Sequence, residues 1–552
     1  MVEDKKQDSS VQILSTEEWL IRAKGLVPTA LHLARQVNVF PSKWKVIISK
    51  LEQIPPQLSH LSTHPCFSKN PLCNEQLQAV SKTLNEAIEL AQSCVDEKYE
   101  GKLRMQSNLD SLIGNLDLNL RDCGLLIKTG VLAEVTFSSG PANHGCIKEL
   151  LARLQIGDLE AKRKALDSLV GIMEDDEKEL FAVMGRSNIA ALIRLLVGPS
   201  LKIREKTVSV ICSLSESGIF DNWLILENVI SPLVRLVDSG SSFCKEKATI
   251  SLQRLSISVE TSRSIVDNNG IKPLIEICTS VDSITQAAAA CTLRNISVVP
   301  ELRQKLAEEG IVKAMVFLLD RAVLSSSKEY AAECLQNLTI NSDDVKKSVF
   351  LEGGITSLLK YLDSPLPQEP AVGVLKNLAD SFSTDKLISL GILARLARVL
   401  EMGSLGARQA AASAICGVCV SGENKRLVGE SGCISSLVKM LEAKNNEARE
   451  VAARAIASLM SISCNCKLVK REEKSVPSLV ALLDSGPHNT AKKYAVSCLV
   501  MMSLSKKCRR MMISYGAIGY LKKLVDMDIP GAKKLLESLE MGKLKRLLST
   551  GK

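Results

Sequence analysis

The chain has 552 residues, with 70 lysines and arginines against 61 aspartates and glutamates, which gives a formal net charge of +9. Aromatic residues make up only 3%, and this favours interfaces between thin helices filled by leucine and alanine over one large globular core. No apolar run is long enough to span a bilayer, and residues 1–10 are polar and charged. The sequence therefore predicts neither a membrane-spanning helix nor a secretory signal.

The first part of the chain, 1–130, is expected to form a four-helix-bundle-like domain. Apolar residues recur there at steps of three and four, as in Leu77, Val80, Leu84 and Ile88, which is the spacing of an amphipathic helix. Four such patterns are present, at about 17–37, 41–62, 74–96 and 100–128. The following stretch, 131–149, contains a run of small residues and is predicted to be a linker.

From residue 150 to residue 526 a short apolar phrase returns at nearly constant intervals. Its aliphatic anchors are Ile189, Ile230, Ile271, Ile311, Ile355, Ile392, Ile434, Val476 and Ile518. Successive gaps lie between 37 and 44 residues. A period near forty is typical of stacked helical repeats, in which each unit buries its apolar face against its neighbours. Such a chain presents a long surface, so we expect binding rather than catalysis.

A second phrase keeps the same period. It is rich in alanine and ends in Leu-x-Asn-Leu or a relative of it, at Asn295, Asn337 and Asn377. The frame continues without asparagine through Ser213, Arg254, Gly417, Ser458 and Met501. Glycines precede the anchors at Gly270, Gly310, Gly354, Gly391 and Gly432. They are expected where one helix ends and the next begins, in a backbone conformation with positive φ.

These two phrases together resemble the armadillo repeat, and the resemblance covers roughly 150–526. It implies an all-α, right-handed solenoid of about nine repeats, each with three helices, whose third helices line a groove. It also implies that Asn295, Asn337 and Asn377 contact the backbone of an extended peptide there, since an amide can both donate and accept. The alternative is that these amides only tie neighbouring helices together. The full set of predicted groove residues is Arg254, Arg294, Asn295, Gln336, Asn337, Lys376 and Asn377.

The resemblance also disfavours one class of partner. Nuclear-import receptors of the armadillo family place tryptophan four residues before each groove asparagine, where it clamps lysine stems. This sequence has Cys291, Glu333 and Gly373 at those positions. A basic nuclear-localisation cargo is therefore not expected. Arg254, with Arg294 and Lys376 beside two of the asparagines, favours a partner with acidic side chains.

One repeat departs from the regular spacing. The gap before Ile355 is 44 residues and the gap after it is 37. Pro365, Pro367 and Pro370 follow, and proline both removes a backbone donor and clashes inside a helix. The second helix of this repeat is therefore expected to be shortened.

The last segment, 527–552, is predicted to be a basic helix that caps the array. Leucines can share one face of it, and Lys533, Lys534, Lys543, Lys545 and Arg546 can share the other. A basic amphipathic helix can also contact an anionic membrane surface or an acidic partner. Nucleic acid is not expected, because no aromatic residues interleave with the basic ones to stack on bases.

The whole layout resembles plant armadillo proteins that have a helical domain before the repeats. Many of those carry a U-box and act as ubiquitin ligases, but the U-box sequence is missing here. We find no pattern typical of a catalytic site, a cofactor site or a metal site. The sequence therefore predicts a non-enzymatic scaffold or adaptor that binds a protein partner, in the cytoplasm and also in the nucleus. Two alternatives stay open: substrate recognition in a ubiquitin-ligase pathway, and peripheral membrane tethering through the basic helix.

Overall fold

The computed structural model describes residues 14–128, 132, 143–157, 159–280, 282–365, 368–379, 384–484, 486 and 489–549. The side chains of 143–145, 176 and 541–549 are outside this description. Every regular element in these ranges is a helix, which confirms the predicted all-α class. The chain forms two compact units, Met1–Leu233 with Ser241–Ser251 and Val234–Gly240 with Leu252–Lys552.

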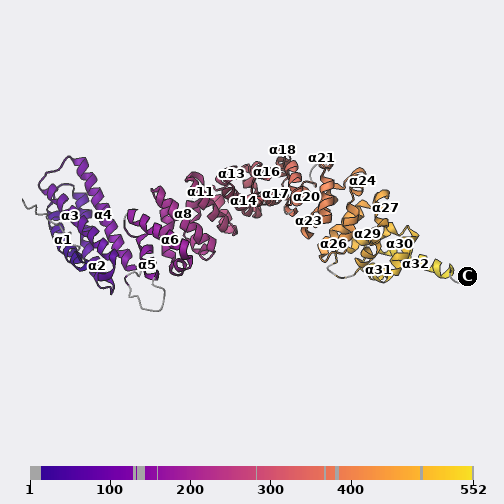
Figure 1. The fold of residues 1–552 in the computed structure, drawn as a ribbon, viewed down its shortest axis with the longest axis horizontal. Helices are drawn as coiled ribbons and strands as arrows, with labels where there is room; N and C mark the ends of the chain where they lie inside the picture. The colour runs from indigo at the N-terminus through magenta and orange to yellow at the C-terminus, as the bar shows by residue number, and fades with distance from the viewer. Residues whose placement is uncertain are drawn as a thin grey trace, which may run out of the picture. The chain divides into compact units, whose positions relative to one another are not determined.

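Four long helices open the first unit. They are α1 (Thr16–Gln36), α2 (Pro41–Ser62), α3 (Pro71–Val95) and α4 (Lys102–Lys128), with a short 3₁₀ helix at Phe67–Lys69. α1 begins at a capping box, in which the Ser15 hydroxyl accepts from the Glu18 amide and the Glu18 carboxylate accepts from the Ser15 amide. α1 packs on α2 and α3, and α4 packs on α2 and α3 (Figure 1). Trp44, Leu51, Leu84 and Leu112 are buried between them.

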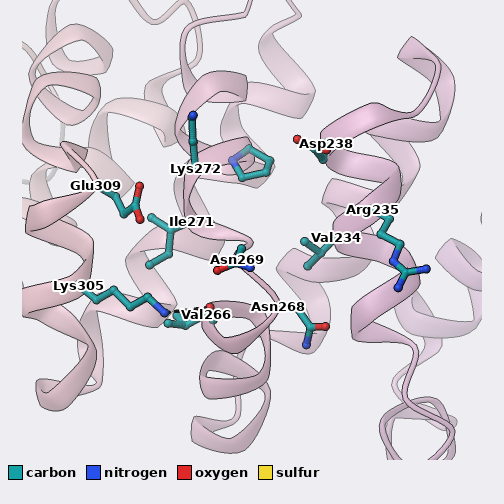
Figure 2. Close-up of a pocket in the computed structure, with 11 residues that line it drawn as sticks. Val234, Arg235, Asp238, Val266, Asn268, Asn269, Ile271, Lys272, Lys305 and Glu309 are labelled. Atoms are coloured by element: carbon teal, nitrogen blue, oxygen red, sulfur yellow. Dashed lines mark hydrogen bonds between the residues drawn. The ribbon is translucent and has the colours of Figure 1, made fainter.

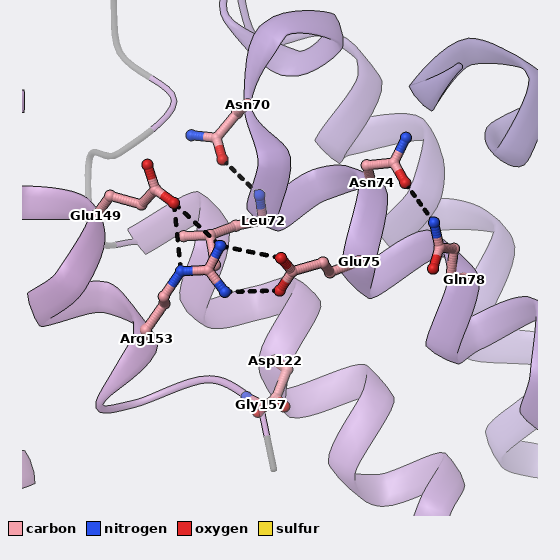
Figure 3. A network of polar contacts seen from close by, with 9 residues as sticks. All are labelled: Asn70, Leu72, Asn74, Glu75, Gln78, Asp122, Glu149, Arg153 and Gly157. Atoms are coloured by element: carbon pink, nitrogen blue, oxygen red, sulfur yellow. Dashed lines mark hydrogen bonds and ion pairs between the residues drawn. The ribbon is translucent and has the colours of Figure 1, made fainter. Parts of the chain in front are cut away.

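Polar contacts join this bundle to the helices that follow it. Arg153 ends α5 (Asn143–Arg153), and its two terminal nitrogens lie 2.7 and 2.9 Å from the carboxylate oxygens of Glu75 in α3. Arg153 also donates to Glu149 one turn earlier, at 3.0 Å (Figure 3). The buried carboxylate of Asp122 in α4 accepts from the Gly157 amide at 3.4 Å. α5 begins inside the range predicted to be a linker.

Beyond α5 and the long α6 (Leu159–Val183), helices alternate in a fixed order of second, third and first. The second helices are α7 (Arg186–Leu196), α10 (Ile230–Ser239), α13 (Ile271–Cys278), α16 (Ile311–Arg321), α19 (Gly354–Leu362), α22 (Ile392–Met402), α25 (Cys433–Met440), α28 (Ser475–Ala481) and α31 (Ala517–Asp526). Each contains one of the nine predicted anchors, and all the anchors except Ile518 are buried. The predicted forty-residue unit is thus confirmed.

The other two helix types complete each repeat. The third helices are α8 (Leu201–Ser217), α11 (Ser242–Leu255), α14 (Ser283–Val298), α17 (Ser325–Leu338), α20 (Glu369–Ala379), α23 (Leu405–Val418), α26 (Asn446–Leu459), α29 (Lys492–Met502) and α32 (Ala532–Ser549). The first helices are α9 (Asp221–Leu226), α12 (Val259–Asp267), α15 (Arg303–Glu308, after a 3₁₀ turn at Pro300–Leu302), α18 (Asp343–Leu351), α21 (Thr384–Ser389), α24 (Gly422–Glu430), α27 (Ser463–Arg471) and α30 (Lys506–Ser514).

In the second unit, consecutive third helices pack on one another from α14 through α17, α20, α23 and α26 to α29. Small residues allow this close approach: Ala332, Ala411, Ala412 and Ala453 are fully buried. α32, predicted to be a separate cap, packs on α31 and α29 in the same way. It therefore occupies the third-helix position of the last repeat.

Ion pairs join successive second helices. Asp320 of α16 accepts from Ser357 and lies 3.4 Å from the Lys360 amino group, both in α19. Asp363, just after α19, lies 2.8 Å from Arg395 and 2.7 Å from Arg398 in α22, and these contacts hold the pKa of its carboxyl below the usual value. Glu442 and Lys474, 3.1 Å apart, repeat the arrangement farther along.

Buried asparagines join successive first helices. Asn465 of α27 is fully buried, and its amide nitrogen donates to the carbonyl oxygen of Lys425 in α24 at 2.7 Å and to that of Leu459 at 3.2 Å. A Cβ on Gly429 of α24 would lie only 1.9 Å from the Asn465 side-chain oxygen. Glycine at this position therefore makes room for the amide.

All five predicted glycines lie where a second helix begins, but only three of them have the predicted positive φ. Gly310, Gly391 and Gly432 have φ between 80° and 85°. Gly270 and Gly354 are right-handed, and the residues before them carry the positive φ, Asn269 at 60° and Gly353 at 75°. Gly270 and Gly354 serve a different purpose, because a Cβ at Gly270 would lie 2.7 Å from Ile265 and one at Gly354 would lie 2.8 Å from Val349.

This difference gives a first testable prediction. Gly270→Ala should destabilise its repeat by about 2 kcal/mol through overpacking against Ile265. Gly310→Ala is the matched control, because its Cβ would enter open space and only the positive φ would cost about 1 kcal/mol. Hydrogen exchange of α12 and α13 measures the effect of Gly270→Ala, and hydrogen exchange of α15 and α16 measures the effect of Gly310→Ala. Equal effects would contradict the packing role of Gly270.

The proline prediction for the irregular repeat is right about the second helix but misses a change in the third. α19 has nine residues, against 11 in α16 before it and 11 in α22 after it, although α13 and α25 have only eight. Pro365 follows the end of α19, and Pro370 lies in the first turn of α20. There a proline costs nothing, because the first amides of a helix have no partner within it. The third helix is also short, with 11 residues in α20 against 14 in α17.

Candidate functional site

All the predicted groove residues lie on third helices at one register. Arg254 is in the last turn of α11, and the others lie in pairs: Arg294 and Asn295 in α14, Gln336 and Asn337 in α17, Lys376 and Asn377 in α20. Arg254 and Lys376 are exposed, and the other five are half-buried. We call the exposed surface of 252–255, α14, α17, α20, α23, α26 and α29 the third-helix face.

The three asparagines hold neighbouring repeats together through their amide nitrogens. Asn295 donates to the Ser256 hydroxyl at 2.8 Å, and Asn337 donates to the Ser297 hydroxyl at 3.0 Å. Asn377 donates to the Thr339 hydroxyl at 3.0 Å and to the Gln336 carbonyl at 3.1 Å. The helix-tying role weighed as an alternative is thus present. It does not use the side-chain oxygens, which have no hydrogen-bond partner within the described ranges.

Arg294 is fixed by the next third helix. Its guanidinium carbon lies 5.3 Å from the ring centre of Tyr330, and its Nε lies 2.9 Å from a carboxylate oxygen of Glu333, both in α17. Burial raises the pKa of Glu333, an effect that Arg294 opposes and Glu329 reinforces. The planar cation is therefore held in one orientation at the surface.

The Gln336 side chain lies against Gly373 of the next third helix. A Cβ added to Gly373 of α20 would lie 2.4 Å from the Gln336 amide nitrogen. The Gln336 side chain therefore covers Gly373, and a larger residue at 373 would displace it.

Carboxylates on the same face were missed by the sequence prediction. Glu329, Glu369 and Glu450 lie eight residues before the frame positions Asn337, Asn377 and Ser458. Glu369 reaches over Gly406 of α23, and Glu450 accepts from the Thr490 hydroxyl. The signal was present in the sequence, since Glu205 and Glu246 hold the same register before Ser213 and Arg254. Carboxylates therefore recur along the third helices, while Arg254 and Arg294 supply the cations at the end of α11 and in α14.

A hollow of about 430 Å³ opens on the third-helix face between the end of α11, the start of α12, and α14. Ile257, Val259, Val298 and Val299 line it, together with Arg254, Arg294 and Asn295. Its volume lies in the range of small-ligand pockets. Three predicted groove residues therefore meet at one concave place.

A second hollow, of about 400 Å³, lies beside the second helices (Figure 2). Arg235 and Asp238 of α10 line one side of it, and Lys305 and Glu309 line another. The Lys305 amino group donates to the Val266 carbonyl at 3.4 Å. Both signs of charge line it, with Lys272 as a third cation, and no predicted site residue reaches it.

The basic C-terminal residues are described only in part. Lys533 and Lys534, in the first turn of α32, are exposed, and neither lies within 4.0 Å of a described carboxylate. The side chains of Lys543, Lys545 and Arg546 lie outside the described residues. Within the described ranges, no helix is long and apolar enough to cross a membrane, and no group of His, Cys, Asp and Glu has the geometry to hold a metal ion.

Comparison with known proteins agrees with this architecture. The model of the armadillo/beta-catenin-like repeat matches residues 258–298 and 423–461. An engineered protein of known structure superposes with a TM-score of 0.61 at 23% identity, covering 71% of this chain and 98% of its own. A designed armadillo repeat protein matches at 22% identity with a TM-score of 0.39, covering 42% of this chain and 99% of its own. Two segments of the chain therefore match the armadillo repeat, and the engineered protein shares its α-solenoid fold.

Two further matches concern its relatives and its N-terminal part. U-box domain-containing protein 8 of Arabidopsis thaliana is 29% identical over 198 residues. That alignment spans 35% of this chain and half the length of the relative. Residues 21–131, which contain most of the helical bundle, match a domain of unknown function, DUF7032.

Proposed function

We propose that this protein is a non-enzymatic scaffold that holds an extended segment of a protein partner along the third-helix face. The observation that carries the proposal is the row Asn295, Asn337 and Asn377, one per repeat, whose side-chain oxygens have no partner within the described ranges. A peptide backbone offers N–H donors along its length, and each amide oxygen can accept one. Armadillo arrays are typical of protein-binding scaffolds, which supports the same conclusion.

The test is partner capture with a variant of the face. Arg254→Glu, Asn295→Ala, Asn337→Ala and Asn377→Ala, combined in one full-length protein, should remove a defined partner from affinity purification with mass spectrometry. Each asparagine also ties two repeats, so the variant must first show an unchanged circular-dichroism spectrum and a melting temperature within a few degrees of wild type. Conservative Asn→Ser replacements serve as a second set if the alanine variant fails this check.

A matched control carries Lys313→Ala, Thr356→Ala and Lys439→Ala, which change exposed residues of the second helices. It should keep every partner of the wild type. If the face variant folds and retains the same partners as this control, the third-helix face is not the binding surface.

Two other functions receive support from particular observations. The partial match to a U-box protein, in a chain whose sequence lacks the U-box, supports substrate recognition within a ubiquitin-ligase complex, and co-purification of a separate ligase subunit would test it. The exposed Lys533 and Lys534 support contact with an anionic membrane, which salt-sensitive liposome flotation would test. We also propose that the scaffold is located in the cytoplasm and the nucleus, and imaging of a fluorescently tagged protein would test this location.

A further inference from the structure

The hollow between α11, α12 and α14 has an apolar wall that is exposed to solvent. Ile257 is 82% exposed, Val298 53% and Val259 42%, and all three line the hollow. Exposed aliphatic side chains gathered at one concave place indicate an interaction site rather than a tolerated surface. A partner side chain that filled the hollow would remove apolar area from water on both molecules.

The wall belongs to a longer row. Ile257 and Val298 each follow a frame position, Arg254 and Asn295, by three residues. The same offset gives Ile340, Val420 and Leu504, which are 39%, 72% and 83% exposed. An apolar edge therefore runs at or just past the C-terminal ends of the third helices in most repeats of the second unit. This periodic edge suits an extended segment that carries apolar residues along one side.

The polar rim of the hollow has one sign of charge. Arg254 and Arg294 line it, and no carboxylate does. The Arg294 guanidinium carbon lies 5.3 Å from the ring centre of Tyr330, and its Nε lies 2.9 Å from a carboxylate oxygen of Glu333 without the alignment of a hydrogen bond. A guanidinium fixed in this way binds a further carboxylate with little loss of rotamer freedom, and its planar fork matches a carboxylate in geometry. The side-chain oxygen of Asn295 adds an acceptor beside the two cations.

We propose that this hollow is the anchor of the third-helix face and takes an aliphatic side chain of the partner that has an aspartate or glutamate within two positions of it. The aliphatic side chain fills the space between Ile257 and Val298, and the carboxylate pairs with Arg254 and Arg294. This inference rests on the proposed function and adds to it the chemical class of the bound segment. It also separates this face from one that binds basic cargo.

The test is a selection of phage-displayed random twelve-residue peptides on the full-length protein, followed by affinity measurement of the enriched peptides by fluorescence anisotropy. Enriched peptides should carry an aliphatic residue with an acidic residue within two positions. Ile257→Lys and Arg254→Glu should each weaken their binding at least tenfold. Both replaced side chains are exposed, so the fold is expected to survive, and a thermal melt confirms this.

Two matched controls lie in the same unit. Ile284→Lys changes an exposed isoleucine of α14 that does not line the hollow, and Arg235→Glu changes an exposed arginine of α10. Both should leave peptide affinity within twofold of wild type. A selection that enriches nothing, or peptides that lack the paired aliphatic and acidic residues, would overturn the inference.

The outcomes separate the two proposals. Peptides that lose affinity with Asn337→Ser but not with Ile257→Lys would keep the third-helix face as the binding surface and refute the anchor. Peptides unaffected by both variants would refute both proposals together.

Discussion

Asn465→Ala is expected to destabilise the repeats around α24 and α27 by about 2–4 kcal/mol. The substitution removes two hydrogen bonds from a buried amide, to the carbonyl oxygens of Lys425 and Leu459, and each contributes about 0.5–1.5 kcal/mol. It also leaves a void beside Gly429, since no Cβ stands there to fill it. Hydrogen exchange followed by mass spectrometry would locate the loss in α24 and α27.

The control is Asn446→Ala, which changes an exposed asparagine in the first turn of α26. Surface replacements of this kind usually stay within about 0.5 kcal/mol of wild type. Because each repeat contacts only its neighbours, exchange in α14 and α17 should stay unchanged in both variants. Similar exchange in α24 and α27 for the two variants would show that Asn465 does not join the repeats.

Truncation after Ile529 is expected to lower both the solubility and the stability of the protein. It removes α32, whose Ala532, Leu535 and Leu539 are buried against the last repeat. Burial of each leucine stabilises by roughly 1.5–3 kcal/mol, so the last repeat should lose about 3–5 kcal/mol and expose apolar surface of α29 and α31. Size-exclusion chromatography and the melting temperature measure the expected aggregation and loss of stability.

A shorter truncation, after Met541, separates the two roles given to the C-terminal helix. It keeps the three buried residues and removes Lys543, Lys545 and Arg546. We expect a melting temperature close to that of the full chain. If this truncation melts as early as the longer one, the described part of α32 is not what completes the last repeat.

The architecture could be predicted from the periodicity of the sequence. Each unit buries its apolar face against a similar unit, so the buried apolar positions recur at a nearly constant interval. Ile271, Ile311 and Ile392 each begin a second helix, as the spacing indicated. Local backbone roles were harder to predict. A glycine before an anchor can provide positive φ, as at Gly310, or make room for a neighbouring side chain, as at Gly270. Both requirements select glycine, so the sequence does not distinguish them.

The sequence predicted which residues lie on the third-helix face, but it did not predict their contacts. The Asn295, Asn337 and Asn377 register followed from the repeat, but their hydroxyl partners lie 38 to 40 residues away, and only the stacking of the third helices brings them together. The hollow was unpredictable for the same reason, because Ile257 and Val298 belong to different repeats. The glutamates at 329, 369 and 450 could have been predicted, because each lies eight residues before a frame position.

The ion pairs between second helices bear on whether these repeats are interchangeable modules. Asp320 meets a serine and a lysine, Asp363 meets two arginines, and Glu442 meets a lysine and a serine. Exposed pairs add little stability, yet a wrong neighbour leaves an acid without its cation or sets like charges together. In all three cases the acid lies on the earlier repeat and the cation on the later one. Shuffling these repeats would keep the matching, so the pairs favour one direction of stacking and leave the order of the repeats free.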